Sequence, residues 1–377
     1  MRFAPALLLT GLIVGTAPFL GKLQKVARDR VDSDRLVLFL TAFFVVSGIG
    51  ISATLLVRWL RERGDQEAPR RPGAWLWVVA GAVLVGAQIL LSERGSASAA
   101  AYERLHFILY GLLAILLYRA FTETCSQRWS ALGAAAGVLT ASLLDEGVQW
   151  LVPLRTGEFF DLGLNLYGGV AGLLAAQALP ARPAEGRTDA RPVVVLVAIA
   201  LLGLLLFVDR AHLGHRIEDP EIGTFHSFHT AVELASANED RRRRWADDMP
   251  QLPLRTALAV EDYFLTEAGW HVLLRNRARA DGDPEIVWHE TRILERFYPA
   301  TLEIPDGDWF RYRLPEVERA ELERVTPREG YWSPADNGRI WLWPRWVLLV
   351  AVVVVALLVG ALWRAAQSQP SRVSSIS

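Results

Sequence analysis

The chain has 377 residues, of which 52% are hydrophobic, and its formal net charge at neutral pH is only −1. Soluble domains contain a little under half apolar residues, so this composition favours a membrane protein. No basic stripe is present, which excludes nucleic acid as a partner. The single cysteine, Cys125, excludes an intramolecular disulfide.

Apolar stretches long enough to cross a bilayer recur along the whole chain. A transmembrane helix needs roughly 17–25 residues with no charge in its centre. Eight stretches meet this requirement: 4–21, 36–57, 73–92, 105–121, 130–151, 162–179, 192–208 and 340–363. The first resembles a signal peptide, but Pro18 follows the best small-residue cleavage site, Ala17. We therefore expect it to be retained as a span.

These stretches predict an all-α, polytopic membrane protein of about eight transmembrane helices, with one soluble domain inserted before the last helix. Residues 1–72 hold two spans, and residues 73–180 hold four spans with short connectors. A seventh span lies within 181–208, and 340–377 hold the eighth span and a Ser-rich tail. The inserted domain, 209–339, has 18 Arg against 26 Asp and Glu, a net charge of −8.

The inserted domain is expected to be mostly helical. Thr230 and Glu233 have the spacing of a capping box, ahead of a helix that runs through Trp245. Apolar residues recur at helical spacing over 254–280, which stops at Asp281-Gly282, and again over 286–298 and 315–325. Aromatic residues at this spacing are expected in the core: Trp245, Tyr263, Phe264, Trp270 and Trp288.

Two His-x-x-His pairs stand at the start of the inserted domain. They are His212 with His215 and His226 with His229. Four imidazoles could hold zinc, but the sequence EDPEIGTF between the pairs is typical of a loop, and no cysteine assists. We therefore expect surface or hydrogen-bonded histidines and no metal site.

The distribution of Lys and Arg in short loops favours an N-terminus inside the cell. The inner loops then hold 13 of these residues and the outer loops 8, although the loop 22–35 opposes this vote with five. Consecutive spans alternate in direction. The start of the fourth span, the end of the fifth, the start of the sixth and residues 209–339 therefore share one membrane side. We expect this side to be extracytoplasmic, at the inner membrane of a bacterial cell.

Hydrogen-bonding residues gather at that side of the membrane. Ionisable groups are costly against lipid and turn towards protein or water. Residues three or four apart share a helix face. The arginine of the connector is a natural counter-charge for the carboxylates and suits anionic ligands. The residues are His106, Glu146, Gln149, Arg155, Asp161 and Asn165.

Small residues predict close packing of the fifth and sixth spans. The sixth has a small-xxx-small face from 168 to 172, and the fifth begins with small residues over 133–137. Such residues let helix backbones approach one another in lipid. We therefore expect Asn165 to lie within reach of Gln149.

The order of these motifs resembles the VanZ-like family over roughly residues 73–180. A His at a span start (YERLHFILYGLL) is followed by Asp-Glu-x-x-Gln, Pro-x-Arg and Asp-x-x-x-Asn-x-x-Gly. The resemblance implies a small multi-span membrane domain whose polar positions are the six residues above. The namesake of the family is associated with low-level resistance to the glycopeptide teicoplanin.

Two functions are compatible with the cluster besides purely structural hydrogen bonding. The first is a non-catalytic envelope protein, surrounded by membrane lipids. It would bind an envelope lipid or peptide-like ligand through Gln149, Arg155 and Asn165, while its acidic domain docks a partner. The second is a membrane enzyme acting on a lipid-linked anionic substrate, with Glu146 or His106 as acid or base. We favour the first.

Other functions are less well supported by the sequence. No nucleophile motif such as Gly-x-Ser-x-Gly occurs, so no reaction can be named. A metal held by His106, Glu146 and Asp161 would have one imidazole, which is few for zinc, so no cofactor is expected. A transporter would place paired broken helices at mid-membrane, whereas these polar groups gather at one edge.

Overall fold

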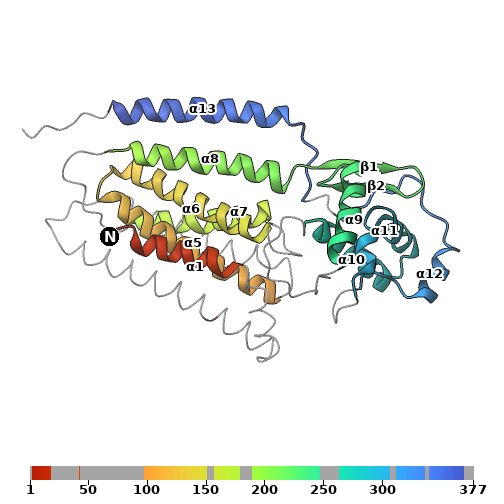
Figure 1. Cartoon of the computed structure of the whole chain (residues 1–377). Helices are drawn as coiled ribbons and strands as arrows, with labels where there is room; N and C mark the ends of the chain where they lie inside the picture. Colours follow the sequence, from red (N-terminus) through yellow and green to blue (C-terminus); the bar gives the residue numbers. More distant parts are fainter. Residues whose placement is uncertain are drawn as a thin grey trace, which may run out of the picture. The chain divides into compact units, whose positions relative to one another are not determined.

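The computed structural model (Figure 1) describes residues 2–17, 42, 97–150, 157–178, 189–246, 263–305, 311–335 and 339–368. The expected spans 36–57 and 73–92 lie outside this part of the chain, apart from residue 42, and so does Arg155. The described residues form two compact units. We call 1–145, 159–205 and 350–377 the membrane unit, and 146–158 with 206–349 the polar unit.

Long apolar helices make up the membrane unit. Five of the described helices are long and apolar enough to cross a membrane, and they match the fourth to eighth predicted spans. A further apolar helix, α1 (Ala4–Thr16), is shorter. The five are α5 (Ala97–Thr122), α6 (Gln127–Trp150), α7 (Phe159–Ala178), α8 (Arg191–Ala211) and α13 (Trp346–Gln367).

Glycines bring α5 and α7 together most closely. A Cβ at Gly172 would lie 2.1 Å from the backbone oxygen of Gly111, and one at Gly168 would lie 2.7 Å from that of Phe107. Only glycine allows this approach of two backbones. The prediction that the face 168–172 packs on the fifth span was therefore wrong, because its outer glycines face α5.

The fifth and sixth spans do touch, by another face. A Cβ at Gly169 of α7 would lie 2.6 Å from the Val138 side chain of α6. The small residues at the start of α6 also face α5, since a Cβ at Gly133 would meet Phe121 and one at Gly137 would meet Leu117. The helix α5 thus packs against both later helices.

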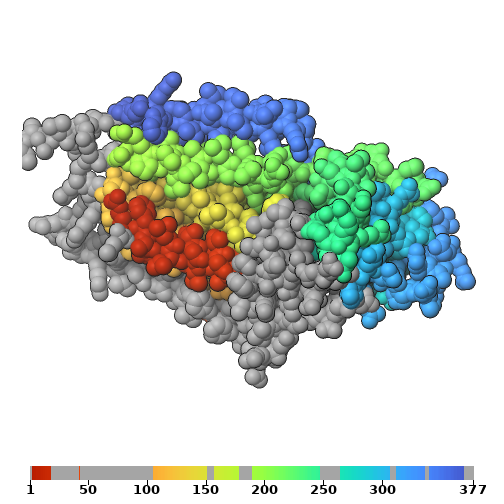
Figure 2. Space-filling model, in the orientation of Figure 1, coloured from red at the N-terminus to blue at the C-terminus, as the bar shows by residue number. Residues whose placement is uncertain are grey.

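The last apolar helix, α13, is exposed along its length. None of its most apolar 18-residue window is buried. Figure 2 shows the near side of this helix, in blue, at the surface. Near its C-terminal end, Ala366 joins an apolar cluster with Val193 and Val194 of α8 and Trp129 of α6. Its remaining surface suits contact with lipid.

The polar unit begins with a short hairpin, so the all-α description needs correction. Strand β1 (His215–Asp219) pairs antiparallel with β2 (Gly223–Ser227), with His215 opposite Ser227. Gly223 has a φ of 117°, which suits glycine at the turn. The segment 218–225, predicted as a loop, is therefore largely strand.

Helices form the rest of the polar unit. The capping box of Thr230 and Glu233 is present at the start of α9 (Ala231–Trp245), as predicted. α10 (Tyr263–Asp281) ends at Gly282, whose φ is 73°. The remaining helices are α11 (Pro284–Phe297), η4 (Pro299–Glu303) and α12 (Glu316–Leu322). α12 is shorter than the predicted 315–325.

Both strands and helices contribute to the core of the polar unit. Phe225 of β2, Leu234 of α9, Phe264 of α10 and Ile293 of α11 are all buried in one apolar cluster. Trp245 and Trp270 are buried as predicted. The strand, the capping box and the apolar periodicity thus converge on one hydrophobic interior.

The two ends of the inserted domain meet in a short parallel bridge. The Trp341 amide donates to the His212 oxygen at 2.6 Å, and the Gly214 amide donates to the Trp341 oxygen at 3.1 Å. His212 directly follows α8, and Trp341 lies five residues before α13. The bridge therefore holds the first and last residues of the inserted domain together.

Candidate functional site

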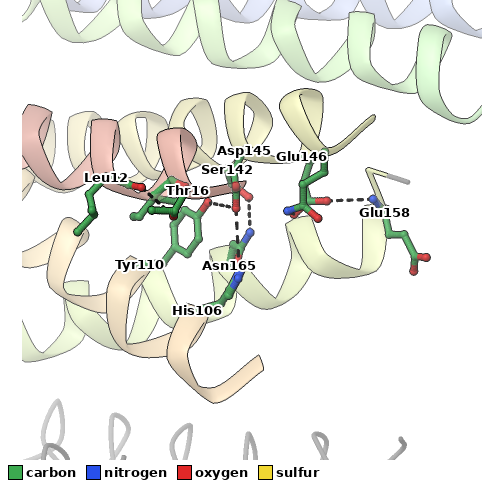
Figure 3. A network of polar contacts seen from close by, with 11 residues as sticks. Leu12, Thr16, His106, Tyr110, Ser142, Asp145, Glu146, Glu158 and Asn165 are labelled. Atoms are coloured by element: carbon green, nitrogen blue, oxygen red, sulfur yellow. Dashed lines mark hydrogen bonds and ion pairs between the residues drawn. The ribbon is translucent and has the colours of Figure 1, made fainter. Parts of the chain in front are cut away.

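A polar cluster joins α5, α6 and α7 within the membrane unit (Figure 3). The Asn165 amide nitrogen on α7 donates to Ser142 Oγ on α6 at 2.9 Å. The Asn165 oxygen lies 3.3 Å from His106 Nδ1 on α5. Asn165 and Ser142 are fully buried. The amide therefore links three helices at one point.

Asp145 is the acidic member of this cluster. Its carboxylate accepts a hydrogen bond from the Tyr110 hydroxyl at 3.0 Å and lies 4.0 Å from His106 Nδ1. The Asp145 side chain is 1% exposed, whereas that of His106 is 26% exposed. The cluster thus places a buried acid behind an accessible imidazole.

Helical spacing explains how these side chains converge. His106 and Tyr110 are four apart on α5, and Ser142 and Asp145 are three apart on α6, so each pair shares a face. Close approach of α5 to α7 at their glycines then brings Asn165 within reach of both faces. Tyr110, Ser142 and Asp145 are not among the predicted site residues, although Asp145 opens the Asp-Glu-x-x-Gln motif and this same spacing could have indicated all three.

Glu146, the next residue after Asp145, belongs to the polar unit and has different partners. Its carboxylate accepts hydrogen bonds from the Gln149 amide at 3.3 Å and from the Glu158 backbone N–H at 3.1 Å. Glu146 is fully buried, and Gln149 is 2% exposed. The predicted shared face of Glu146 and Gln149 is therefore present. The described hydrogen bonds of Asn165 run to Ser142 and His106, and its predicted proximity to Gln149 stays a prediction.

The two other predicted site residues are Arg155 and Asp161. Arg155 lies in 151–156, outside the described residues. Asp161 lies in the first turn of α7, one turn before Asn165, and is half-buried. Its place on the helix matches the prediction that it shares a face with Asn165.

The histidine pairs of the polar unit are held within the fold. His212 Nδ1 donates to the Arg339 backbone oxygen at 2.8 Å, and the imidazole stacks on Trp341 at 4.6 Å. His226 is buried edge-on to Trp332, while His215 and His229 are half-buried. Over the described ranges, no three His, Cys, Asp or Glu side chains are grouped to hold a metal ion. Burial lowers the pKa of both His212 and His226.

A buried ionic network lies elsewhere in the polar unit. Glu290, fully buried, accepts hydrogen bonds from His271 Nδ1 and from the Tyr331 hydroxyl, both at 2.6 Å. Glu267, also fully buried, accepts from Ser227 Oγ and from the Tyr298 hydroxyl, both at 2.7 Å. These groups tie α10 and α11 to neighbouring segments without facing solvent, which is a structural role.

Comparison with known proteins places the polar cluster inside a recognised domain. A family model described as VanZ/LLP1 matches residues 87–179. No curated protein and no solved structure matched the chain. The matched segment contains every predicted site residue as well as Tyr110, Ser142 and Asp145, and it excludes α8, α13 and the helices of the polar unit. Over residues 87–179, this chain therefore carries a VanZ-like domain of the VanZ/LLP1 family.

Proposed function

We propose that this chain is a VanZ-like, multi-pass protein of the bacterial inner membrane that binds an envelope lipid or a peptide-like envelope ligand at the polar cluster. The observation that carries the proposal is the arrangement of His106. Its contacts within the described residues run through Nδ1, and its side chain keeps 26% of its surface exposed. If the polar residues served only to hydrogen-bond the helices to one another, the imidazole would not need to be accessible in front of a buried acid.

The chemistry of the cluster suits the polar group of an amphiphile. Asp145 lies 4.0 Å from His106 Nδ1, and the imidazole can donate a hydrogen bond from Nε2 to a phosphate or carboxylate. Arg155, Gln149 and Asn165 remain the predicted ligand-binding residues beside it. An apolar tail would stay among the lipid-exposed helix surfaces, so a lipid or lipidated ligand fits best.

No observation favours the enzyme alternative. Glu146, which with His106 is one of its two predicted acid or base residues, is fully buried and accepts hydrogen bonds from Gln149 and from the Glu158 backbone. A general base needs to reach the proton that it abstracts. In its described contacts, Glu146 instead binds the backbone N–H of Glu158 at the end of the α6–α7 connection.

Residues 209–339 complete the proposal. We place them outside the cytoplasm, where their net charge of −8 would attract a basic partner protein or basic ligand group. A receptor role of this kind would combine a membrane-level ligand with a soluble-phase partner.

The test uses the full chain in phosphatidylcholine nanodiscs with increasing phosphatidylglycerol, and native mass spectrometry to count retained phosphatidylglycerol. His106→Asn is expected to weaken retention about tenfold, the effect of losing one charge-assisted hydrogen bond. Arg155→Gln should act in the same direction. His215→Asn, a histidine change in the polar unit, should leave retention unchanged.

A second arm of the experiment separates the two ligand classes. Teicoplanin is added to the same nanodiscs without phosphatidylglycerol. Binding of teicoplanin that depends on His106, without selective retention of phosphatidylglycerol, identifies a peptide-like ligand. Equal binding of both probes by the wild type and by His106→Asn refutes the proposed site.

A further inference from the structure

Arg339 connects three parts of the polar unit that are far apart in the sequence. Its Nε lies 2.9 Å from Glu158 Oε1, in the connection between α6 and α7. Its guanidinium lies 4.9 Å from the centroid of the Trp270 ring on α10. Its backbone oxygen accepts a hydrogen bond from His212 Nδ1 at 2.8 Å. The arginine is therefore held by its side chain and by its backbone.

Glu158 is in turn held at both of its ends. Its carboxylate pairs with Arg339, and its backbone N–H donates to Glu146 Oε2 at 3.1 Å. Glu158 directly precedes Phe159, the first residue of α7. Fixing Glu158 therefore fixes where α7 begins, and α7 carries Asn165 of the polar cluster.

The surroundings of Gly157 show that the end of this connection is closely packed. A Cβ at Gly157 would lie 2.4 Å from the Glu146 backbone oxygen and 3.0 Å from the Phe207 ring. Only glycine fits between these two groups. The end of the connection thus lies in contact with Glu146 and Phe207 of the polar unit.

The chemistry of Arg339 suits positioning more than global stability. Its side chain is 38% exposed and that of Glu158 is 32% exposed, so the pair is screened by solvent. The planar guanidinium, however, can pair with a carboxylate and lie over an aromatic face at the same time. A lysine would keep the charge and lose both the planar pairing and the broad ring contact.

We infer that Arg339 is a positioning residue through which the inserted domain docks on the α6–α7 connection and sets the start of α7. Arg339 lies outside the family match at 87–179, so the inserted domain supplies a residue that the VanZ-like segment itself lacks. The docking needs no ligand and stands apart from the proposed function.

A reporter thiol at the start of α7 tests the inference. The full chain carries Cys125→Ala, which removes its single cysteine, and Phe160→Cys, at a side chain that is 51% exposed. The measurement is the initial rate of maleimide labelling in native membranes. Arg339→Gln and Glu158→Gln should each raise the rate about two- to fivefold, the scale of an exposed ion pair. The double variant should exceed neither single variant.

The polar unit offers a matched control. Arg328 Nε lies 3.1 Å from Glu285 Oε2, and these side chains are 58% and 43% exposed. Arg328→Gln removes a similar pair that does not touch the connection, so it should leave the labelling rate unchanged. Equal rates for Arg339→Gln and Arg328→Gln overturn the inference.

Charge exchange and cross-linking cover the remaining outcomes. Glu158→Arg combined with Arg339→Glu should restore slow labelling, and failure to restore it counts against docking by this pair. If the Arg339→Gln protein does not accumulate in the membrane, a second experiment replaces it. The double variant Glu158→Cys, Arg339→Cys is treated with a short bis-maleimide. Cleavage at a protease site inserted between α9 and α10 should then leave the fragments joined. Separate fragments overturn the inference.

Discussion

Two consecutive acidic residues, Asp145 and Glu146, have separate tasks. Neighbouring residues on an α-helix point about 100° apart, so they meet different surroundings. Asp145 faces Tyr110 and His106 within the membrane unit, while Glu146 accepts from the Glu158 backbone in the polar unit. Both are at most 1% exposed. The helix α6 thus uses one pair of carboxylates to organise two different regions.

The hydrogen bond between Tyr110 and Asp145 can be tested by a change of one atom. Tyr110→Phe removes a donor from a buried carboxylate and should lower the free energy of unfolding by about 1–2 kcal/mol. Unfolding in mixed micelles measures this difference. Thr10→Val is the control, because the Thr10 hydroxyl donates to Ala6 within its own helix. Equal losses for both variants would contradict a cross-helix role.

Histidines of the polar unit should make its stability depend on pH. His289 Nδ1 donates to the Ile222 oxygen at 2.6 Å, and Nε2 accepts from the Arg328 N–H at 3.0 Å, which requires the neutral imidazole. Burial lowers the pKa of His289 from 6.5, with the hydrogen bond to Ile222 opposing it in part. The pKa values of His212 and His226 shift in the same direction.

The sign of the pH effect follows from these shifts. The unfolded chain takes up protons as the pH falls through 6.5, while the folded imidazoles stay neutral. Stability from His289 is therefore complete above that pH and is lost below it, by up to about 1.4 kcal/mol per pH unit. Thermal unfolding of the full chain, followed by tryptophan fluorescence from pH 8 to pH 5, measures the loss. His289→Gln should flatten the dependence, and an unchanged slope would contradict it.

The packing of helix α5 against helix α7 depends on two glycines, Gly111 and Gly172. The Gly172 position faces the backbone of Gly111, so a new methyl group there cannot be accommodated by a side-chain rotation. The polar cluster depends on this contact, since it brings Asn165 of α7 to His106 of α5. The distance between α5 and α7 therefore determines the geometry of the polar cluster.

Gly172→Ala should separate these two helices. Its Cβ would lie 2.1 Å from the Gly111 oxygen, so we expect a loss of about 1–3 kcal/mol. Gly163→Ala on the same helix is the control, because its Cβ would meet nothing within 4 Å and alanine favours the helix. Unfolding in mixed micelles compares them. A Gly172→Ala protein as stable as the control would disprove the close contact.

The hairpin of the polar unit could not be read from local pattern. Strand β1, HRIED, has one apolar residue, Ile217, and the turn contains a proline. The buried Asp219 is satisfied by the backbone N–H groups of Glu221 and Ile222, both at 3.0 Å, and by Arg296 at 3.0 Å. A strand stabilised by such partners resembles a loop in sequence. Helix ends were easier, because capping boxes and glycines act within a few residues.

Over the described residues, the sequence predicts the long apolar helices better than it predicts which side chains meet. The helices that match the fourth to eighth predicted spans follow from apolar length alone. The contacts of Asp145, Ser142 and Tyr110 depend on how each helix is rotated about its axis, which the neighbouring helices decide. Arg339 meets Glu158 from 181 positions away, and no spacing rule connects residues at that separation.

The arrangement of spans predicts a common side for three connectors. Reporter fusions after residues 95, 157 and 220 should report the same compartment, because the predicted alternation of spans puts the start of the fourth span, the end of the fifth and residues 209–339 on one membrane side. We expect this compartment to be outside the cytoplasm, so alkaline phosphatase fusions should be active. A split result would break the alternation on which the proposed site depends.

The exposure of α13 has a consequence for how this protein can vary. None of its most apolar window is buried, so the main requirement on this helix is an apolar length that matches the hydrocarbon core of a bilayer. Reordering its valines, leucines and alanines should leave folding intact. Shortening the helix should instead draw the residues that precede it towards the bilayer. In this region, selection would act on the length of the helix and tolerate changes in the order of its apolar residues.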